Sequence, residues 1–503
     1  MPSPSSEVAI FNKAAGGTIS IPNTNYNVGG IRFDSSAGTY TISRTSGTTR
    51  NLTIYSYGIV NNDDSDQTIT GANLRVTLGS ASTFSVNGAG DLTISTTGGT
   101  IATTATNTLT LNGDGAGLGT ISSQIAGTGG TVTKSGTGTW LLSGSNSYTG
   151  GTTIAGGNLR VGSANALGTT GTVRFTGGTL QYGSGITTDY SSRIGNSTGA
   201  ISIDTNGNNV TYANALANTN SGGLTKSGSG TLTLNAANNY TGTTTLNAGT
   251  LAIGNNSALS SGGLTINGGT LSASGGARSL SNAVTASGDF TIGGANDLTL
   301  SGTFNLGGGT RTVTVDNTGT TTLSGVISEP WYSSLAKAGD GRLVLSGANT
   351  FTGFVQVNNG TLAITNNNSL GASGTWDNVV ADGATLELSN GITVTEGGFT
   401  VAGTGHSGVG ALHNYSGDNT LNGQIAASGA TTINSSAGTL TLGSYTNLNG
   451  YALTVGGAGN VTFNAKEHGD GTTVTKQDDG ILTFAGSNSY TGATNIDNGT
   501  LVA

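Results

Sequence analysis

Few side chains in this 503-residue sequence could perform chemistry, and they are scattered. The densest acidic cluster is Asp63, Asp64 and Asp66, in the stretch NNDDSDQ. Acid–base catalysis on a carbohydrate needs carboxylates or basic groups that converge in one groove. Because these aspartates lie in a turn-like stretch rich in Asn, Asp and Ser, we interpret them as residues of a solvated loop rather than a metal or catalytic site.

The sequence contains three histidines, His406, His413 and His468. The first two flank the stretch SGVGAL and Asp418 follows, so the residue types would suit zinc. Their separation of seven positions fits neither common short ligand spacing, which favours polar loop residues. A triad of Ser416, His413 and Asp418 lacks the strand–turn–helix context of a nucleophile elbow.

Calcium-binding solenoids repeat the motif G-G-x-G-x-D in tandem. The nearest stretch here, GGANDLTL from residue 293, occurs once. The sequence therefore predicts no metal site, no cofactor and no catalytic residue, and we expect the protein not to be an enzyme.

One aromatic stretch stands out, SEPWYSS at residues 328–334. It places Glu329, Pro330, Trp331 and Tyr332 before the third copy of a repeat whose other copies carry small polar residues there. An exposed Trp–Tyr pair could stack on a sugar ring or contact a partner protein, whereas the alternative is that Trp331 folds back onto the core. The other two tryptophans, at positions 140 and 376, align with Leu or Val of other copies and are predicted to be core residues.

Composition excludes several classes of protein. The chain has 89 Gly, 4 Pro and no Cys, and charged residues make up 8% of it. A net charge of -8 and only 16 scattered basic residues give no electrostatic basis for binding nucleic acid. Disulfides and thiolate metal sites are impossible without cysteine. What fits is a fold with many tight turns and a thin apolar core.

Neither a signal peptide nor a membrane span is visible in the sequence. Residues 1–20 lack a basic region followed by an apolar stretch, and no run of about 18 apolar residues occurs anywhere. We therefore expect no direct membrane insertion by this segment, and any leader or anchor to lie outside it.

Four copies of one pattern align without gaps on a lysine. An asparagine follows twelve positions later and an aromatic residue two further on, so that each copy reads N-x-(Y/F)-T-G. The equivalent positions are Lys134, Lys226, Lys337 and Lys476; Asn146, Asn238, Asn349 and Asn488; and Tyr148, Tyr240, Phe351 and Tyr490. We interpret these as structural positions of an internal repeat and assign the asparagine to a local hydrogen bond within its corner.

Apolar residues within each copy alternate with polar ones, as at Leu232 and Leu234 or at Leu251 and Ile253. A step of two residues is the period of a strand with one buried face. Such strands cannot bury their apolar face alone, so stacking of neighbours must supply the core. A β-sandwich array would need linkers, and none is visible. The sequence therefore predicts an all-β fold, a right-handed parallel β-helix that forms a single elongated rod with coils of roughly 20–25 residues.

The predicted organisation is one continuous β-solenoid over residues 1–503. Residues 1–130 contain strand-like stretches without the lysine-anchored pattern. Residues 131–503 contain the four repeat cores, at 132–161, 224–254, 335–364 and 474–503.

The pattern L-T-K-x-G-x-G-x-L-x-L … N-x-Y-T-G-x-T … G-T-L-x-I-G resembles the passenger-associated repeat of bacterial autotransporters. This resemblance implies a secreted β-helix and an extracellular or cell-surface location in bacteria. We expect a structural or adhesive scaffold without catalysis. The alternatives are a filament subunit that pairs end to end with copies of itself through open solenoid ends, and a β-helix that binds glycans or degrades polysaccharides. Partners would thus be the protein itself or surface glycans and proteins.

Overall fold

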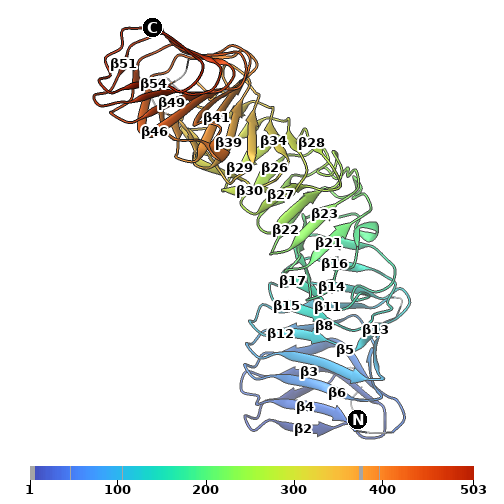
Figure 1. Cartoon of the computed structure of the whole chain (residues 1–503). Helices are drawn as coiled ribbons and strands as arrows, with labels where there is room; N and C mark the ends of the chain where they lie inside the picture. Colours follow the sequence, from blue (N-terminus) through green and yellow to red (C-terminus); the bar gives the residue numbers. More distant parts are fainter. Residues whose placement is uncertain (1–5, 46, 105, 373–377, 396) are drawn as a thin grey trace. The chain divides into compact units, whose positions relative to one another are not determined.

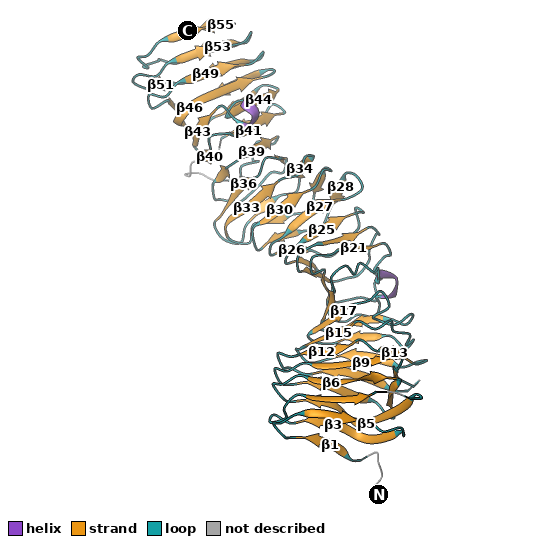
Figure 2. Ribbon diagram, turned by 60° about the horizontal axis from the view of Figure 1, so that its bottom comes forward, coloured by secondary structure: helices purple, strands orange, loops and turns teal. Residues whose placement is uncertain are grey.

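The computed structural model describes residues 6–503 apart from 46, 105, 373–377 and 396. The described chain is a stack of parallel β-strands joined by short turns, which confirms the predicted β-solenoid (Figures 1 and 2). Its only helical elements are two single turns of 3₁₀ helix, η1 (Ser191–Arg193) and η2 (His406–Gly408). The chain divides into two compact units, Met1–Thr244 and Thr245–Ala503.

The first unit contains two long parallel sheets and one short strand pair. The first sheet has the order β13 (Gln124–Ala126), β10 (Thr100–Ala102), β7 (Leu74–Leu78), β5 (Arg50–Asn61), β8 (Ser82–Val86), β11 (Thr108–Asn112), β14 (Thr131–Lys134), β16 (Thr152–Ile154) and β18 (Val173–Phe175), with β3 (Tyr26–Phe33) pairing both β5 and β1 (Val8–Phe11). The second has the order β2 (Gly17–Ser20), β4 (Tyr40–Arg44), β6 (Gln67–Ala72), β9 (Leu92–Thr97), β12 (Leu118–Ile121), β15 (Thr139–Leu142), β17 (Asn158–Val161), β19 (Thr179–Tyr182), β20 (Ile201–Asp204) and β22 (Leu224–Ser227). The pair is β21 (Asn209–Tyr212) with β23 (Thr231–Leu234).

The second unit continues the same design with three sets of strands. The longest has the order β25 (Thr250–Ile253), β27 (Thr270–Ala273), β28 (Arg278–Leu280), β30 (Phe290–Gly293), β31 (Leu298–Leu300), β33 (Gly309–Val315), β34 (Thr320–Leu323), β36 (Ser333–Ala338), β37 (Arg342–Leu345), β38 (Val355–Val357), β39 (Gly360–Ile364), β40 (Asn378–Val380), β41 (Ala384–Ser389), β43 (Phe399–Gly403), β44 (Leu412–Ser416), β46 (Ile425–Ser435), β48 (Thr446–Asn447), β49 (Leu453–Gly456), β51 (Glu467–His468), β52 (Val474–Lys476) and β54 (Thr494–Ile496). The others are β26 (Leu264–Ile266), β29 (Val284–Ala286), β32 (Phe304–Asn305) and β35 (Ile327–Ser328), and β42 (Thr393–Val394), β45 (Asn419–Leu421), β47 (Thr439–Leu442), β50 (Asn460–Phe463), β53 (Ile481–Phe484) and β55 (Thr500–Val502). Strand β24 (Thr244–Leu246) begins at the last residue of the first unit.

Register fixes which side chains stack inside each unit. Ile42, Ile69, Ile94 and Ile121 are successive partners across β4, β6, β9 and β12, and all are at most 4% exposed. Each such column of buried aliphatic side chains contributes about 1.5–3 kcal/mol per residue to the stability of the fold. The predicted alternation is therefore the pattern that forms the core.

Turn length varies along the chain more than the sequence pattern predicted. Thr139 and Asn158, which are partners on β15 and β17, lie 19 residues apart. Tyr40 and Gln67, which are partners on β4 and β6, lie 27 residues apart. The difference is taken up in the corners, because the strands themselves stay short and in register.

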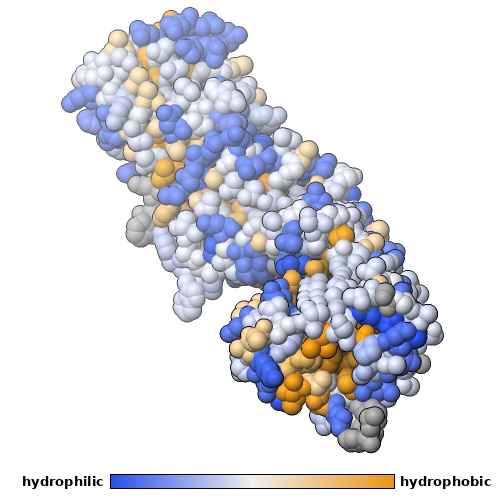
Figure 3. Space-filling model, turned by 90° about the horizontal axis from the view of Figure 1, so that it is seen from below, coloured by the Kyte–Doolittle hydropathy of each residue, from blue (hydrophilic) through white to orange (hydrophobic). Residues whose placement is uncertain are grey.

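The large aromatic residues of the first three repeats lie inside. Trp140 is 1% exposed, as expected of a residue at a leucine position, and its Nε1 donates to the Asn112 carbonyl at 2.8 Å. Trp376 lies outside the described residues. At the amino-terminal end of the described chain the core is open: apolar side chains, among them Phe11, Ile19 and Tyr26, surround a cavity of about 260 Å³, and apolar surface gathers there (Figure 3).

Candidate functional site

The lysine of each repeat is a buried hydrogen-bond donor. All four lysines are at most 1% exposed, and each points its Nζ at backbone carbonyls of the turn that follows its own strand. Lys337, for example, donates to Ala338 at 3.0 Å, to Gly339 at 2.6 Å and to Asn359 on the next turn at 2.9 Å. An ammonium group has three such donors, and carbonyls that would otherwise be buried without partners are satisfied. The lysine therefore stabilises the turn that follows its own strand. In the first and third copies it also forms a hydrogen bond with the next turn of the stack.

The backbone two residues after each lysine adopts the left-handed conformation that directs a carbonyl at Nζ. The φ angles are 66° at Gly136, 67° at Gly228, 76° at Gly339 and 59° at Asp478. Glycine adopts this region without strain and aspartate tolerates it, which explains the residue types found there. Burial lowers the pKa of Lys134, Lys226 and Lys337 to about 8, and it also lowers the pKa of Lys476.

The repeat asparagine joins three successive turns. Oδ1 of Asn146 accepts from the Ile125 amide at 2.7 Å, and its Nδ2 donates to the Ala166 carbonyl at 2.6 Å. Asn349 makes the same two contacts, with Ile327 at 2.8 Å and Ser369 at 2.6 Å. The assignment to a local corner bond is therefore wrong, because the partners lie on the turns before and after the asparagine. In the fourth copy, the equivalent asparagine is exposed.

The repeat aromatic residue is matched to the residue four positions later. The hydroxyl of Tyr148 lies 2.7 Å from Oγ1 of Thr152, and Tyr240 and Tyr490 have the same contact with Thr244 and Thr494. In the third copy Phe351 has no hydroxyl, and the position four residues on is the apolar Val355, so no polar atom is left without a partner. In these buried copies, a tyrosine occurs where a threonine four residues later can form a hydrogen bond with its hydroxyl.

Acidic residues mostly serve the backbone of a neighbouring turn. Asp64 and Asp66 accept from the amides of Ala89 and Asp91, both at 2.9 Å, and Asp63 accepts from Ser65 at 2.7 Å. The loop was predicted correctly, but Asp63 is only 4% exposed, so this part of the loop is not solvated. Asp64 and Asp66 thus link successive turns, and Asp63 stabilises its own loop.

The turn before the fourth repeat core has a carboxylate where the turns before the other three cores have an aliphatic side chain. The carbonyls of Ile125, Leu216 and Ile327 accept from the residue that follows the repeat asparagine, and the equivalent acceptor in the fourth copy is Glu467. Glu467 is fully buried, and among the described residues neither carboxylate oxygen has a hydrogen-bond partner. The same holds for the hydroxyl of Thr446, its partner in register on β48. Burial raises the pKa of Glu467 to about 7.

The aromatic loop presents its tryptophan outward. Trp331 is 78% exposed and Tyr332 46%, so Trp331 does not fold back onto the core. Glu329 instead turns its carboxylate into the loop base, where it accepts from the Ser333 amide and from the Thr352 amide at 2.8 Å. The aromatic pair is thereby held on a clamped loop.

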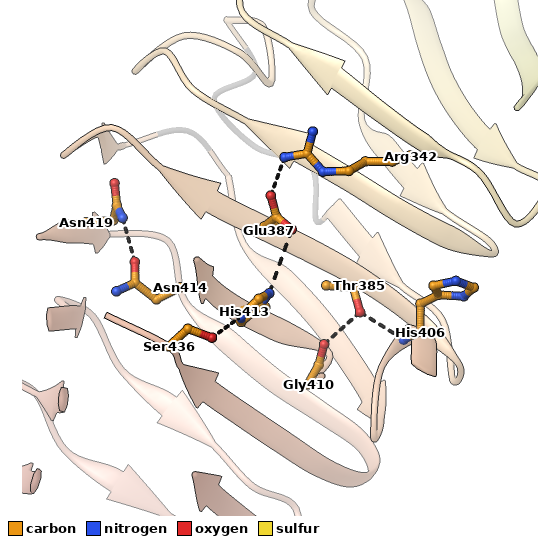
Figure 4. A network of polar contacts seen from close by, with 9 residues as sticks. All are labelled: Arg342, Thr385, Glu387, His406, Gly410, His413, Asn414, Asn419 and Ser436. Carbon is orange, nitrogen blue, oxygen red and sulfur yellow. Dashed lines mark hydrogen bonds and ion pairs between the residues drawn. The ribbon is translucent and has the colours of Figure 1, made fainter. Parts of the chain in front are cut away.

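The histidines take part in no predicted triad or zinc site. His413 is 6% exposed; its Nε2 lies 2.8 Å from Oγ of Ser436 and its Nδ1 lies 3.8 Å from the Glu387 carboxylate (Figure 4). Asp418 accepts from the Thr439 amide, away from His413. Within the described ranges, no three His, Asp or Glu side chains are grouped so that they could hold a metal ion.

The contacts of Glu387 were not predicted from the sequence. Its carboxylate pairs with the Arg342 guanidinium and with His413, which lie on different turns of the stack. Burial alone would raise the pKa of Glu387, but the His413 and Arg342 side chains bring it below its ordinary value. The register of β41 with β44 places Glu387 opposite His413, and this register is known only from the structure.

Comparison with known proteins identifies the repeat. The passenger-associated-transport-repeat family model matches residues 132–161, 224–253, 335–364 and 474–503. Four segments of the chain are therefore copies of that repeat. These matches agree with the four predicted repeat cores to within one residue, and the lysine, asparagine and aromatic residue described above are positions of that repeat.

One relative is named as an autotransporter. The adhesin BmaC autotransporter of Brucella suis biovar 1 (strain 1330) is 30% identical over 312 residues, which cover 57% of this chain and 9% of the relative. The chain thus corresponds to a small part of that protein's length. No solved structure matches the chain significantly. No helix in the described ranges is long and apolar enough to cross a membrane.

Proposed function

We propose that this chain is an adhesive segment of a bacterial autotransporter passenger, located outside the cell or on its surface, and that it performs no catalysis in that role. The observation that carries the proposal is the use of the repeat's polar groups within the fold, combined with similarity to a protein named as an adhesin. The repeat lysines and asparagines hold turns together and are buried in the first three copies. In this proposal the stack is a scaffold, and adhesion belongs to features that project from it.

The aromatic loop is the contact that we propose for adhesion. Trp331 and Tyr332 are among the exposed large apolar side chains, and Glu329 fixes the loop that carries them. A tryptophan held outward on a clamped loop loses little conformational entropy on binding, which favours an aromatic contact with a surface protein or glycan.

Adhesion of beads coated with the purified chain to epithelial cell monolayers tests this proposal. Coated beads should adhere well above uncoated beads, and the double variant Trp331→Ala, Tyr332→Ala should lose most of the adhesion. The matched control Tyr57→Ala, Tyr451→Ala removes two tyrosines that are 57% and 43% exposed elsewhere. Absence of adhesion by the parent chain would refute the adhesive role, whereas equal loss in both double variants would refute the role of the loop.

End-to-end assembly and polysaccharide degradation stay predictions of the sequence. Electron microscopy of the purified chain tests the first, since only separate molecules would exclude spontaneous polymerisation.

A further inference from the structure

A polar groove opens on the second unit, beside the third repeat core. Its volume is about 420 Å³, within the range of small-molecule sites. The turn between β33 and β34 supplies Asp316 and Thr318. The turn between β36 and β37 supplies Asp340, and the first residue of β37 is Arg342. His406 is the first residue of η2. Three separate corners of the chain thus converge on one hollow.

A row of buried side chains holds the arginine of this groove from behind. The Arg342 side chain is 36% exposed, and its Nη2 forms an ion pair with the Glu387 carboxylate. The same carboxylate faces the His413 imidazole (Figure 4). The other N–H groups of Arg342 form no hydrogen bond with the residues that the structure describes. Burying a carboxylate and an imidazole is costly. Among the ion pairs that Arg and Lys form in the described ranges, only the Arg342–Glu387 pair has a buried carboxylate. The chain thus fixes the orientation of a guanidinium whose remaining donors are free.

The loop that carries His406 is strained and tied down. Ser407 has a φ angle of 53°, in a region that non-glycine residues seldom occupy. The His406 amide donates to Oγ1 of Thr385 at 2.8 Å, and that hydroxyl donates to the Gly410 carbonyl at 2.8 Å. Strained backbone held by specific bonds is concentrated at binding sites. The imidazole of His406 is left at the groove wall, with no hydrogen bond among the described residues.

The charges in and beneath the groove select the ligand. The carboxylates of Asp316 and Asp340 repel anions, and the positive charge of Arg342 is neutralised by Glu387. The ammonium group of buried Lys337 interacts electrostatically with both aspartates. The wall therefore combines acceptors and donors with no large net charge. Hydroxyl groups, which donate and accept at once, match such a wall, whereas phosphate or a strong cation does not.

We infer that this groove binds a neutral saccharide, one or a few sugar rings long. The inference rests on the proposed adhesive function and gives it a second contact, independent of the aromatic loop. Carboxylates of Asp316 and Asp340 would accept from sugar hydroxyls, while Arg342 and His406 would donate to sugar oxygens.

Binding of the whole labelled chain to an array of neutral and acidic oligosaccharides tests the inference, followed by titration of each retained glycan. The parent chain should retain neutral glycans, and His406→Ala and Asp316→Asn should each weaken binding about tenfold, the size of one lost hydrogen bond to a charged or polar group. Both variants keep the backbone contacts of the groove. Arg342→Gln serves as a third variant and should weaken binding likewise, with Arg75→Gln on β7 as its matched control.

Retention of no neutral glycan, retention of acidic glycans alone, or unchanged binding by both His406→Ala and Asp316→Asn would overturn the inference. Bead adhesion separates this failure from that of the proposed function. Coated beads that adhere despite both groove substitutions leave the adhesive role standing and remove the groove from it.

Discussion

Replacing Glu467 by leucine tests the account of the repeat most sharply. The equivalent positions in the other three copies hold Ile125, Leu216 and Ile327, so an aliphatic side chain fits this place in the stack. The Glu467 side chain is fully buried and its carboxylate has no hydrogen-bond partner among the described residues, so its ionised form is strongly disfavoured there.

The magnitude follows from the pKa of Glu467, which burial raises from 4.5 to about 7. Between these two pH values the folded chain binds more protons than the unfolded chain, so stability falls as pH rises. The full loss is about 3 kcal/mol, reached just above pH 7. At pH 8 the leucine variant should therefore be more stable locally by at least that amount, and at pH 4 the difference should be small.

Hydrogen exchange of β51 to β54 is the suitable assay, because a stack of turns opens locally rather than as one unit. Protection factors of these amides, corrected for intrinsic exchange, should fall roughly a hundredfold from pH 4.5 to pH 7.5 in the parent chain and stay level in Glu467→Leu. The reciprocal variant Leu216→Glu should introduce the same pH dependence into the first unit. A parent chain with pH-independent protection, or a leucine variant that keeps the parent's slope, would refute the reasoning.

Two further predictions concern the first repeat. Tyr148→Phe should lower the local free energy of unfolding by about 1 kcal/mol, because Thr152 loses its hydrogen-bond partner. Adding Thr152→Val should restore most of that stability, as in the natural third copy. A double-mutant cycle measured by hydrogen exchange checks the coupling, and additive effects of the two substitutions would contradict it. The pKa of Lys134 is about 8 in the folded chain, compared with the ordinary value of 10.5 in the unfolded chain. Between these pH values the unfolded chain binds more protons, so local stability should rise by up to about 3 kcal/mol from pH 8 to pH 10.5. Lys134→Met should lose that rise in the exchange of β14 to β17, and an identical pH profile in the variant would exclude the lysine as its cause.

The fold could be predicted because burial leaves a direct trace in sequence. Leu232 and Leu234 alternate with polar residues, and the structure buries both. The burial of Trp140 followed in the same way from its place at a leucine position. The physical reason is that a strand with one buried face imposes a period of two, whatever its neighbours are.

Contacts between turns could not be predicted, because they depend on register and not on distance along the chain. Asn146 bonds to residues 21 before and 20 after it, and the sequence alone suggested a local partner. Glu387 and His413 come together only because β41 and β44 pair in one particular register. Turns of unequal length conceal such pairs until the strands are aligned.

The asparagine that bridges the turn below and the turn above has a consequence for how such genes change. Its two hydrogen bonds join it to a backbone amide of the preceding turn and a backbone carbonyl of the following turn, and any residue except proline has both groups. Removal or duplication of one whole turn by recombination between repeats brings an equivalent amide and carbonyl into the same places. Natural variants should therefore differ in their number of turns by complete units, while partial turns, which break the bridge, are eliminated.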